Sequence, residues 1–133
     1  MTTKESQSRK VLVLLNDTDL VLVNVIKTKF QKETGWETHI ATSFEDGVEK
    51  YKEKDFNLIL TEMIINDYQG RTGIDFIQAI HAVKKSVKPI VVVFTELGLD
   101  DDIERAKSAG VDHYFVKSKI SLNELIEKVR AIV

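Results

Sequence analysis

The feature that most constrains the fold of this chain is the alternation of short aliphatic runs with longer segments of helical periodicity. Runs rich in Val and Ile at 10–15, 57–61 and 89–95 are nearly continuous, as expected of strands covered on both faces. The segment at 36–41 alternates more and indicates a strand nearer an edge, and 112–117 closes the series. Strands buried on both faces need helices above and below them. The pattern therefore predicts a parallel sheet with right-handed crossovers.

Helical spacing of apolar residues fills the intervals between these strands, and capping residues mark several helix ends. Asp17–Asp19 and Ser43 precede the first two predicted helices, and Ser121 with Glu124 forms a capping-box pattern before the last. Gly110 is placed to end the helix that begins at 100–102. The apolar stripes of the other four helices are carried by Leu20, Val23, Ile26 and Phe30; by Val48 and Tyr51; by Ile74, Ile77, Ile80 and Val83; and by Leu122, Leu125, Ile126, Val129 and Ile132.

Length and charge limit the domain organisation and the classes of partner. The chain has 133 residues, enough for one domain, which we place at 10–133 after a polar, disordered tail at 1–9. With 19 basic and 21 acidic residues the net charge is -2, so neither nucleic acid nor a membrane is an expected partner. Cysteine is absent, which excludes disulfides and thiol catalysis. Without a signal peptide or an apolar run of roughly 18 residues, the chain is expected to be cytoplasmic.

Polar residues follow the predicted strands at the edge where parallel strands end together. In a doubly wound α/β sheet, ligands and reactive groups gather at the carboxyl ends of the strands. These residues are Asn16, Asp17, Glu62, Thr95, Glu96 and Lys117. We therefore expect one rim at which carboxylate, amide, hydroxyl and amine groups meet.

Two motifs in the second half resemble the receiver domain of bacterial and archaeal response regulators. "PIVVVFTE" (89–96) is similar to the fourth strand of that family, and "AKSAGVDHYFVK" (106–117) to its fourth-helix end and fifth strand. The resemblance runs from residue 10 to 133. It implies a CheY-like, flavodoxin-like (βα)5 fold with a three-layer, five-stranded parallel sheet. It also implies that Thr95 and Tyr114 are switch residues and that Lys117 is the family's rim lysine.

The first half departs from the family where a pair of adjacent acids holds Mg²⁺. An ungapped comparison sets Leu15 and Asn16 at the acid-pair positions and leaves Asp17 one residue late. Mg²⁺ requires near-octahedral oxygen ligands, commonly including one or two carboxylates, and phosphoryl transfer depends on such a cation. Asn16 and Asp17 therefore form a degraded metal site, and no cofactor is expected. The histidines at 39, 81 and 113 show no metal-ligand spacing.

The phospho-acceptor position and the loop after it are also changed. Glu62 stands where the family has its acceptor aspartate, and Asn66 where a proline usually follows. The loop to Gly73 is about three residues longer than usual. Because Glu is one methylene longer than Asp, its carboxylate is displaced by about 1.5 Å, and a shift of roughly 1 Å can cost about a hundredfold in rate.

Three interpretations of Glu62 stay open. The carboxylate can be an ion-pair partner of Lys117 at a strand end. It can imitate an acyl phosphate, reaching toward Thr95 and Lys117. It can also be an actual acceptor or metal ligand. Asp67 is interpreted as a loop acid, with a displaced acceptor as its alternative. If Glu62 imitates a phosphate, Glu62→Gln should change partner affinity or self-association with little change in stability.

We therefore interpret the chain as an atypical receiver, not an enzyme, that signals through protein–protein interaction. The expected partner is a histidine kinase, an output protein or a second receiver, and the chain is expected to be a monomer or weak homodimer. The alternative is a phosphorylatable two-component receiver that uses Mg²⁺ and Glu62 or Asp67 as acceptor. A cofactor-binding flavodoxin-like domain rests on the fold alone. By resemblance, the partner surface comprises Arg105, Tyr114, Lys119 and Glu127.

Overall fold

The computed structural model describes residues 9–16 and 20–133 of the chain. Residues 1–8 of the predicted tail lie outside the described residues, as do Asp17 of the predicted rim and the predicted helix cap at 17–19. Over the described part, five strands alternate with five helices. In chain order they are β1 (Lys10–Leu14), α2 (Leu20–Thr34), β2 (Glu37–Ala41), α3 (Phe44–Glu53), β3 (Leu58–Thr61), α4 (Gly73–His81), β4 (Ile90–Thr95), α5 (Asp100–Ser108), β5 (His113–Val116) and α6 (Leu122–Ile132).

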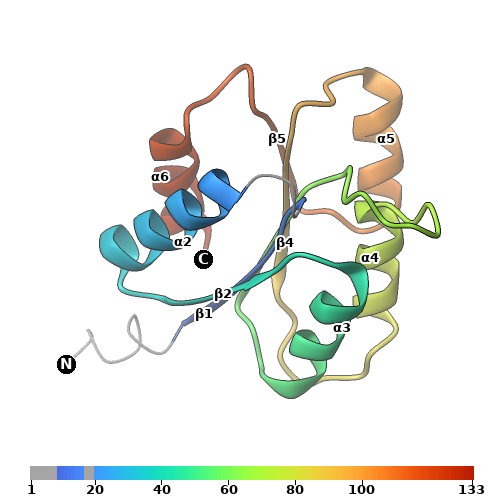
Figure 1. Ribbon diagram of the computed structural model, residues 1–133, viewed down its shortest axis with the longest axis horizontal. Coiled ribbons are helices and arrows are strands. Elements are labelled where there is room, and N and C mark those ends of the chain that lie inside the picture. Colours follow the sequence, from blue (N-terminus) through green and yellow to red (C-terminus); the bar gives the residue numbers. More distant parts are fainter. Residues whose placement is uncertain (1–8, 17–19) are drawn as a thin grey trace.

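The strands form one parallel sheet in the order β2-β1-β3-β4-β5. Figure 1 shows α2 and α6 on one face of this sheet and α3, α4 and α5 on the other, which gives three layers. The predicted doubly wound (βα)5 fold is therefore confirmed. Because all five strands run the same way, their carboxyl ends meet at one edge, where the predicted rim residues follow the strands.

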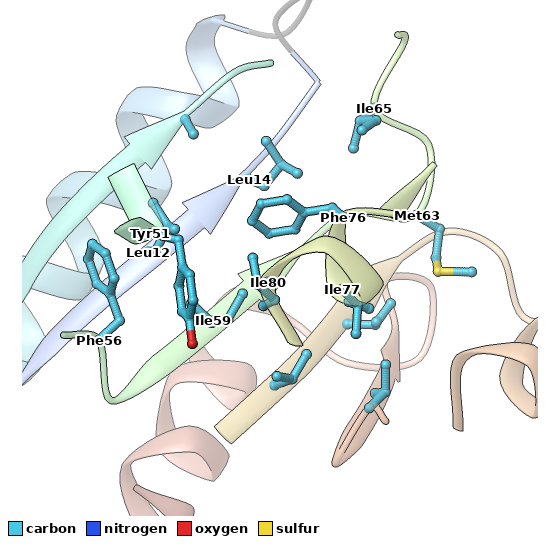
Figure 2. Close-up of a cluster of buried hydrophobic side chains, with 14 of the residues drawn as sticks. Leu12, Leu14, Tyr51, Phe56, Ile59, Met63, Ile65, Phe76, Ile77 and Ile80 are labelled. Atoms are coloured by element: carbon cyan, nitrogen blue, oxygen red, sulfur yellow. The ribbon is translucent and has the colours of Figure 1, made fainter. Parts of the chain in front are cut away.

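The period-2 alternation of β1 divides the core between the two faces of the sheet. Val11 and Val13 belong to the cluster beneath α2 and α6, together with Phe30. Leu12 and Leu14 belong to the opposite cluster, beneath α3 and α4 (Figure 2). The labelled aromatic and aliphatic side chains of this second cluster converge between helix and sheet, and they include Tyr51, Phe56, Phe76, Ile77 and Ile80. Burial on both faces accounts for the continuous aliphatic runs of the central strands.

Three of the predicted helix ends are confirmed in detail. The hydroxyl of Ser43 accepts a hydrogen bond from the amide of Asp46 at 3.1 Å. Ser121 and Glu124 form a reciprocal capping box at the start of α6. Gly110 follows α5 with a φ of +102°, the left-handed conformation that glycine adopts without strain.

Two details of the predicted helices are wrong. Leu20, expected to face the core, is exposed, and in α2 the fully buried positions are Ile26 and Phe30. The third predicted helix was expected to include Val83, but α4 ends at His81. The amides of 82 and 83 donate to carbonyls three residues earlier, so the last turn tightens and the helix stops. Val83 still packs against the core from the turn that follows.

Candidate functional site

Glu62 lies at the centre of the carboxyl edge, one residue beyond β3. The register pairs Leu14 with Thr61 and Thr61 with Val93, so Glu62 emerges between the ends of β1 and β4. Its amide continues the ladder by donating to the carbonyl of Leu14 at 3.0 Å. The residue is only 7% exposed, and a carboxylate this well covered needs partners for its oxygens.

Both carboxylate oxygens of Glu62 accept hydrogen bonds from the protein. Oε1 accepts from Nζ of Lys117 at 2.9 Å. Oε2 accepts from the hydroxyl of Thr95 and from the amide of Met63, the latter at 2.8 Å. The amide of Ile64 makes a longer contact of 3.4 Å with the same oxygen. The negative charge of Glu62 is thus balanced by one ammonium group and shared among neutral donors.

Thr95 and Lys117 reach Glu62 because β4 and β5 end beside it. Thr95 is the last residue of β4 and is fully buried. Lys117 follows β5, and its amide donates to the carbonyl of Thr95 at 2.7 Å. The Nζ atom of Lys117 also lies 5.6 Å from the ring centroid of Phe94, within the range of a cation–π contact. The structure therefore brings together Glu62, Thr95 and Lys117, as the convergence of strand ends predicts.

Tyr114 on β5 is joined to the same group of residues through the chain after β4. Its hydroxyl donates to the carbonyl of Leu97 at 2.7 Å. The amide of Leu97 in turn contacts the hydroxyl oxygen of Thr95 at 3.4 Å. Burial raises the pKa of Tyr114 to about 12, and the negative charges of Asp102 and Glu62 act in the same direction. A continuous path of contacts thus runs from Glu62 through Thr95 and Leu97 to Tyr114.

A cavity of about 250 Å³ opens beside Glu62 at the rim. Leu15, Leu22 and Ile64 supply apolar walls, and Asn16, Thr95, Glu96 and Lys117 supply polar groups. Leu15 is buried and also packs into the cluster beneath α2 and α6. Of the described side chains that line this cavity, those of Glu62 and Glu96 are the carboxylates, and both oxygens of Glu62 already accept hydrogen bonds. These described side chains alone offer fewer free oxygens than the octahedral sphere of Mg²⁺ requires, and Asp17 lies outside the described residues.

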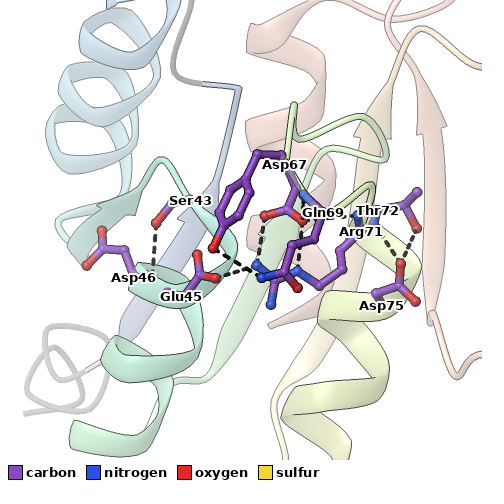
Figure 3. Close-up of polar contacts among 9 residues, drawn as sticks. Ser43, Glu45, Asp46, Asp67, Gln69, Arg71, Thr72 and Asp75 are labelled. Carbon is purple, nitrogen blue, oxygen red and sulfur yellow. Dashed lines mark hydrogen bonds and ion pairs between the residues drawn. The ribbon is translucent and has the colours of Figure 1, made fainter.

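Asp67 belongs to a different network, within the β3–α4 loop, and does not line the cavity. Its Oδ2 accepts from Nε of Arg71 and its Oδ1 from the guanidinium Nη2 of Arg71, both at 2.8 Å (Figure 3). Chiefly through these bonds, the pKa of Asp67 is lowered from its usual 3.8 to about 2. Arg71 also pairs with Glu45 on α3 and lies 3.9 Å from the ring centroid of Phe44. The charge of Asp67 is therefore met by Arg71 within the loop.

Arg71 and the role of Gly73 were not predicted from the sequence. The spacing of four residues between Asp67 and Arg71 could have indicated their ion pair. The contacts of Arg71 with α3 depend on the fold and leave no such pattern in the sequence. Gly73, the first residue of α4, packs directly on the site loop, and its amide donates to the carbonyl of Met63 at 2.8 Å. A Cβ at this position would lie 2.2 Å from the carbonyl oxygen of Glu62. Gly73 therefore allows α4 to approach the backbone that positions Glu62.

The four predicted surface residues lie on elements that flank β5. Arg105 is on α5 and forms an ion pair with Asp102 at 3.0 Å. Tyr114 is on β5 and partly buried, Lys119 is exposed in the turn after β5, and Glu127 is exposed on α6. Figure 1 shows α5 and α6 on opposite faces of the sheet beside this edge strand. Whether these four residues form one partner surface stays a prediction.

A doubly wound five-stranded sheet with a carboxylate, a hydroxyl and a lysine at its carboxyl edge defines the receiver class of signalling domains. The chain matches the family model of the response regulator receiver domain over residues 13–130, and it belongs to that family. The path from Glu62 to Tyr114 thus lies in a receiver of the two-component type. No helix within the described ranges is long and apolar enough to cross a membrane.

Three relatives illustrate how far this similarity extends. The chain is 33% identical to the response regulator protein VraR of Staphylococcus saprophyticus over 89 residues, which cover 66% of this chain and 39% of that protein. It is similar to a two-component response regulator from Clostridium difficile, with 26% identity, a TM-score of 0.79, and coverage of 94% and 95% of the two chains. A CheY-like receiver domain protein from Methanospirillum hungatei shares the fold at 20% identity, with a TM-score of 0.78 and coverage of 94% and 93%.

Proposed function

We propose that this chain is an atypical receiver that signals through protein–protein interaction without accepting a phosphoryl group. The observation that carries the proposal is the full engagement of Glu62. Its two oxygens accept hydrogen bonds from Lys117, Thr95 and Met63, so attack on a phosphoryl donor would disturb these contacts. A nucleophile must be oriented toward the group that it attacks, and these contacts hold the Glu62 carboxylate toward Thr95 and Lys117.

The surroundings of Glu62 support the same proposal. Phosphoryl transfer needs a cation that neutralises charge on the transferring oxygens. Leu15 and Leu22 place apolar surface along the cavity beside Glu62. Asn16 offers an amide where the family has an acid. The proposal therefore includes no Mg²⁺ requirement and no other cofactor.

Asp67 gives little support to phosphotransfer by a displaced acceptor. Its side chain is 4% exposed and is held by Arg71 through two 2.8 Å bonds. Release of Asp67 would leave the guanidinium of Arg71 with Glu45 alone. The loop conformation would also be lost, because the amides of Gln69 and Arg71 donate to Asp67 as well.

The finer proposal is that the Glu62 carboxylate stands in for an acyl phosphate. An acyl phosphate at this position would present anionic oxygens to the rim hydroxyl and the rim lysine, and Glu62 presents its oxygens to Thr95 and Lys117. The path from Thr95 to Leu97 and Tyr114 then holds the β5 edge in one arrangement. A kinase, an output protein or a second receiver would bind that edge. The residues proposed to contact the partner are Arg105, Tyr114, Lys119 and Glu127.

Incubation with acetyl phosphate and Mg²⁺, followed by intact-mass measurement, tests the proposal. We expect no mass increase, while a receiver with an aspartate acceptor, treated in parallel, gains one phosphoryl group. A stoichiometric phosphoryl adduct on this chain would overturn the proposal and establish the phosphorylatable alternative. Peptide mapping of that adduct would then distinguish Glu62 from Asp67 as the acceptor.

A further inference from the structure

The β3–α4 loop carries two large apolar side chains at the surface. In Figure 1 this loop, in light green, projects from the body of the molecule beyond α4. Tyr68 is 85% exposed and Ile64 is 51% exposed. A tyrosine this exposed on a projecting loop is unusual, because aromatic side chains contribute most when they are covered. Tyr68 therefore has the properties of an anchor for another surface.

The loop is fixed in shape although it projects. Asp67 Oδ2 accepts from the amides of Gln69 and Arg71 at 3.0 and 3.1 Å (Figure 3). The amide of Gly70 donates to the carbonyl of Asp67 at 2.9 Å. The guanidinium of Arg71 ties this turn to α3 through Glu45. A loop that is ordered before binding loses less conformational entropy when it binds. The network thus presents Tyr68 in one place.

The tip of the loop also has a defined chemistry. The hydroxyl oxygen of Tyr68 accepts from Nε2 of Gln69 at 3.1 Å, which leaves the phenol proton for an acceptor outside the loop. The charge of Asp67 is met by Arg71, so the tip is close to neutral. A neutral aromatic knob does not suit nucleic acid or an anionic membrane, both of which require basic residues. It suits a recess that combines some apolar surface with a hydrogen-bond acceptor.

Such a recess lies on the same side of this chain, between α4 and α5. A groove of about 570 Å³ begins at Thr72, where the loop ends, and runs between the two helices. Ile74 and Ala109 give it apolar surface. Asp75 and Glu104 add carboxylates that can accept a phenol proton. Tyr68 does not line this groove.

We infer that this face is a self-association surface, in which Tyr68 of each copy inserts into the α4–α5 groove of a second copy. A two-fold dimer requires a knob and its complementary recess on one face, because each residue i that meets j is matched by j meeting i. Here Tyr68 and the groove lie side by side. The phenol of Tyr68 can donate its proton to a carboxylate of Asp75 or Glu104 in the groove. The surface shares Arg105, which lines the groove, with the partner surface of the proposed function, but it does not depend on Glu62. One tyrosine per copy gives a small interface, so the dimer is weak and dependent on concentration.

Sedimentation velocity from roughly 10 to roughly 500 µM protein tests this inference. The wild-type chain should shift from monomer to dimer over this range. Tyr68→Ser should weaken association by at least roughly tenfold, since tyrosines at interface centres often dominate binding. Ser108→Arg should do the same by filling the recess, because Ser108 lies in the groove. Leu20→Ser, at an exposed apolar residue elsewhere, is the matched control and should dimerise as the wild type does.

A mixture of the two weakened variants gives the decisive result. The Tyr68→Ser chain keeps an open groove and the Ser108→Arg chain keeps its tyrosine, so their heterodimer regains one of the two contacts. We expect the mixture to associate more strongly than either variant alone. A wild-type chain that is monomeric throughout the range would overturn the inference, as would a dimer that Tyr68→Ser leaves unchanged.

Discussion

Replacement of Glu62 by Gln tests the rim directly, because it keeps the shape of the side chain and removes its charge. Each oxygen of Glu62 faces donors: the ammonium of Lys117 on one side, and the amide of Met63 with the hydroxyl of Thr95 on the other. A Gln side chain has one oxygen and one NH₂ group. In either orientation, therefore, the NH₂ group must face a donor.

The expected loss of stability is about 2 kcal/mol. A hydrogen bond to a charged group contributes about 1.5–3 kcal/mol, and the exchange removes one such bond outright. Loss of a partner from a fully buried ion pair would cost about 3–5 kcal/mol, but Lys117 retains 20% exposure and can partly hydrate. The contacts thus revise our expectation from sequence that this exchange leaves stability nearly unchanged.

Urea unfolding, followed through Trp36 fluorescence, measures this loss. Trp36 is the single tryptophan and is buried in the cluster beneath α2 and α6, so its emission reports global unfolding. Glu96→Gln is the matched control, since Glu96 lines the same cavity but is exposed. The control should stay within about 0.5 kcal/mol of the wild type. Equal stability of Glu62→Gln and the wild type would refute the claim that both Glu62 oxygens are hydrogen-bonded. The proposed function rests on that claim.

Three further predictions address the backbone, the loop and the metal. Gly73→Ala should destabilise the fold by roughly 2 kcal/mol or more, because its Cβ would meet the carbonyl oxygen of Glu62 at 2.2 Å. Gly98→Ala, whose nearest contact is a methyl at 3.2 Å, should cost less when both variants are measured by urea unfolding. In a carbon-detected NMR titration, Asp67 should ionise near pH 2. Because the pKa of Asp67 is depressed in the folded state, the contribution of Asp67 to stability is complete above its usual pKa of 3.8 and falls as the pH drops toward 2. Arg71→Leu should raise the folded-state pKa of Asp67. Mg²⁺ at millimolar concentration should leave the Tm unchanged relative to EDTA, since a ligand of the native state would raise it.

The sheet and the convergence of the rim could be predicted because their signals are local. Strands buried on both faces leave unbroken runs of Val and Ile, and the ends of parallel strands must meet at one edge. Knowing only that Glu62 ends one strand, Thr95 another and Lys117 a third is therefore enough to place them together. Their hydrogen bonds then follow from proximity and burial.

The parts that sequence reasoning missed depend on contacts between distant elements. Arg71 pairs with Glu45 across 26 residues and lies over Phe44, and no periodicity indicates such a contact. The exposure of Leu20 likewise depends on which turns of α2 the sheet covers, although its helical spacing is that of a core residue. The sequence does not distinguish Tyr68 from an ordinary loop residue. The network around Asp67 and Arg71, which fixes the loop, is visible only in the structure.

The substitutions at the rim are physically coherent when they are considered together. The carboxylate at position 62 is balanced by Lys117, so its charge is already compensated within the protein. Acids at positions 15 and 16 would then repel one another and Glu62 without compensation. An apolar residue at position 15 avoids this repulsion, and burial of the Leu15 side chain contributes about 2 kcal/mol. With a glutamate at position 62 that pairs with Lys117, a buried Leu15 is therefore compatible with the rim, whereas an acid at position 15 would add an uncompensated charge.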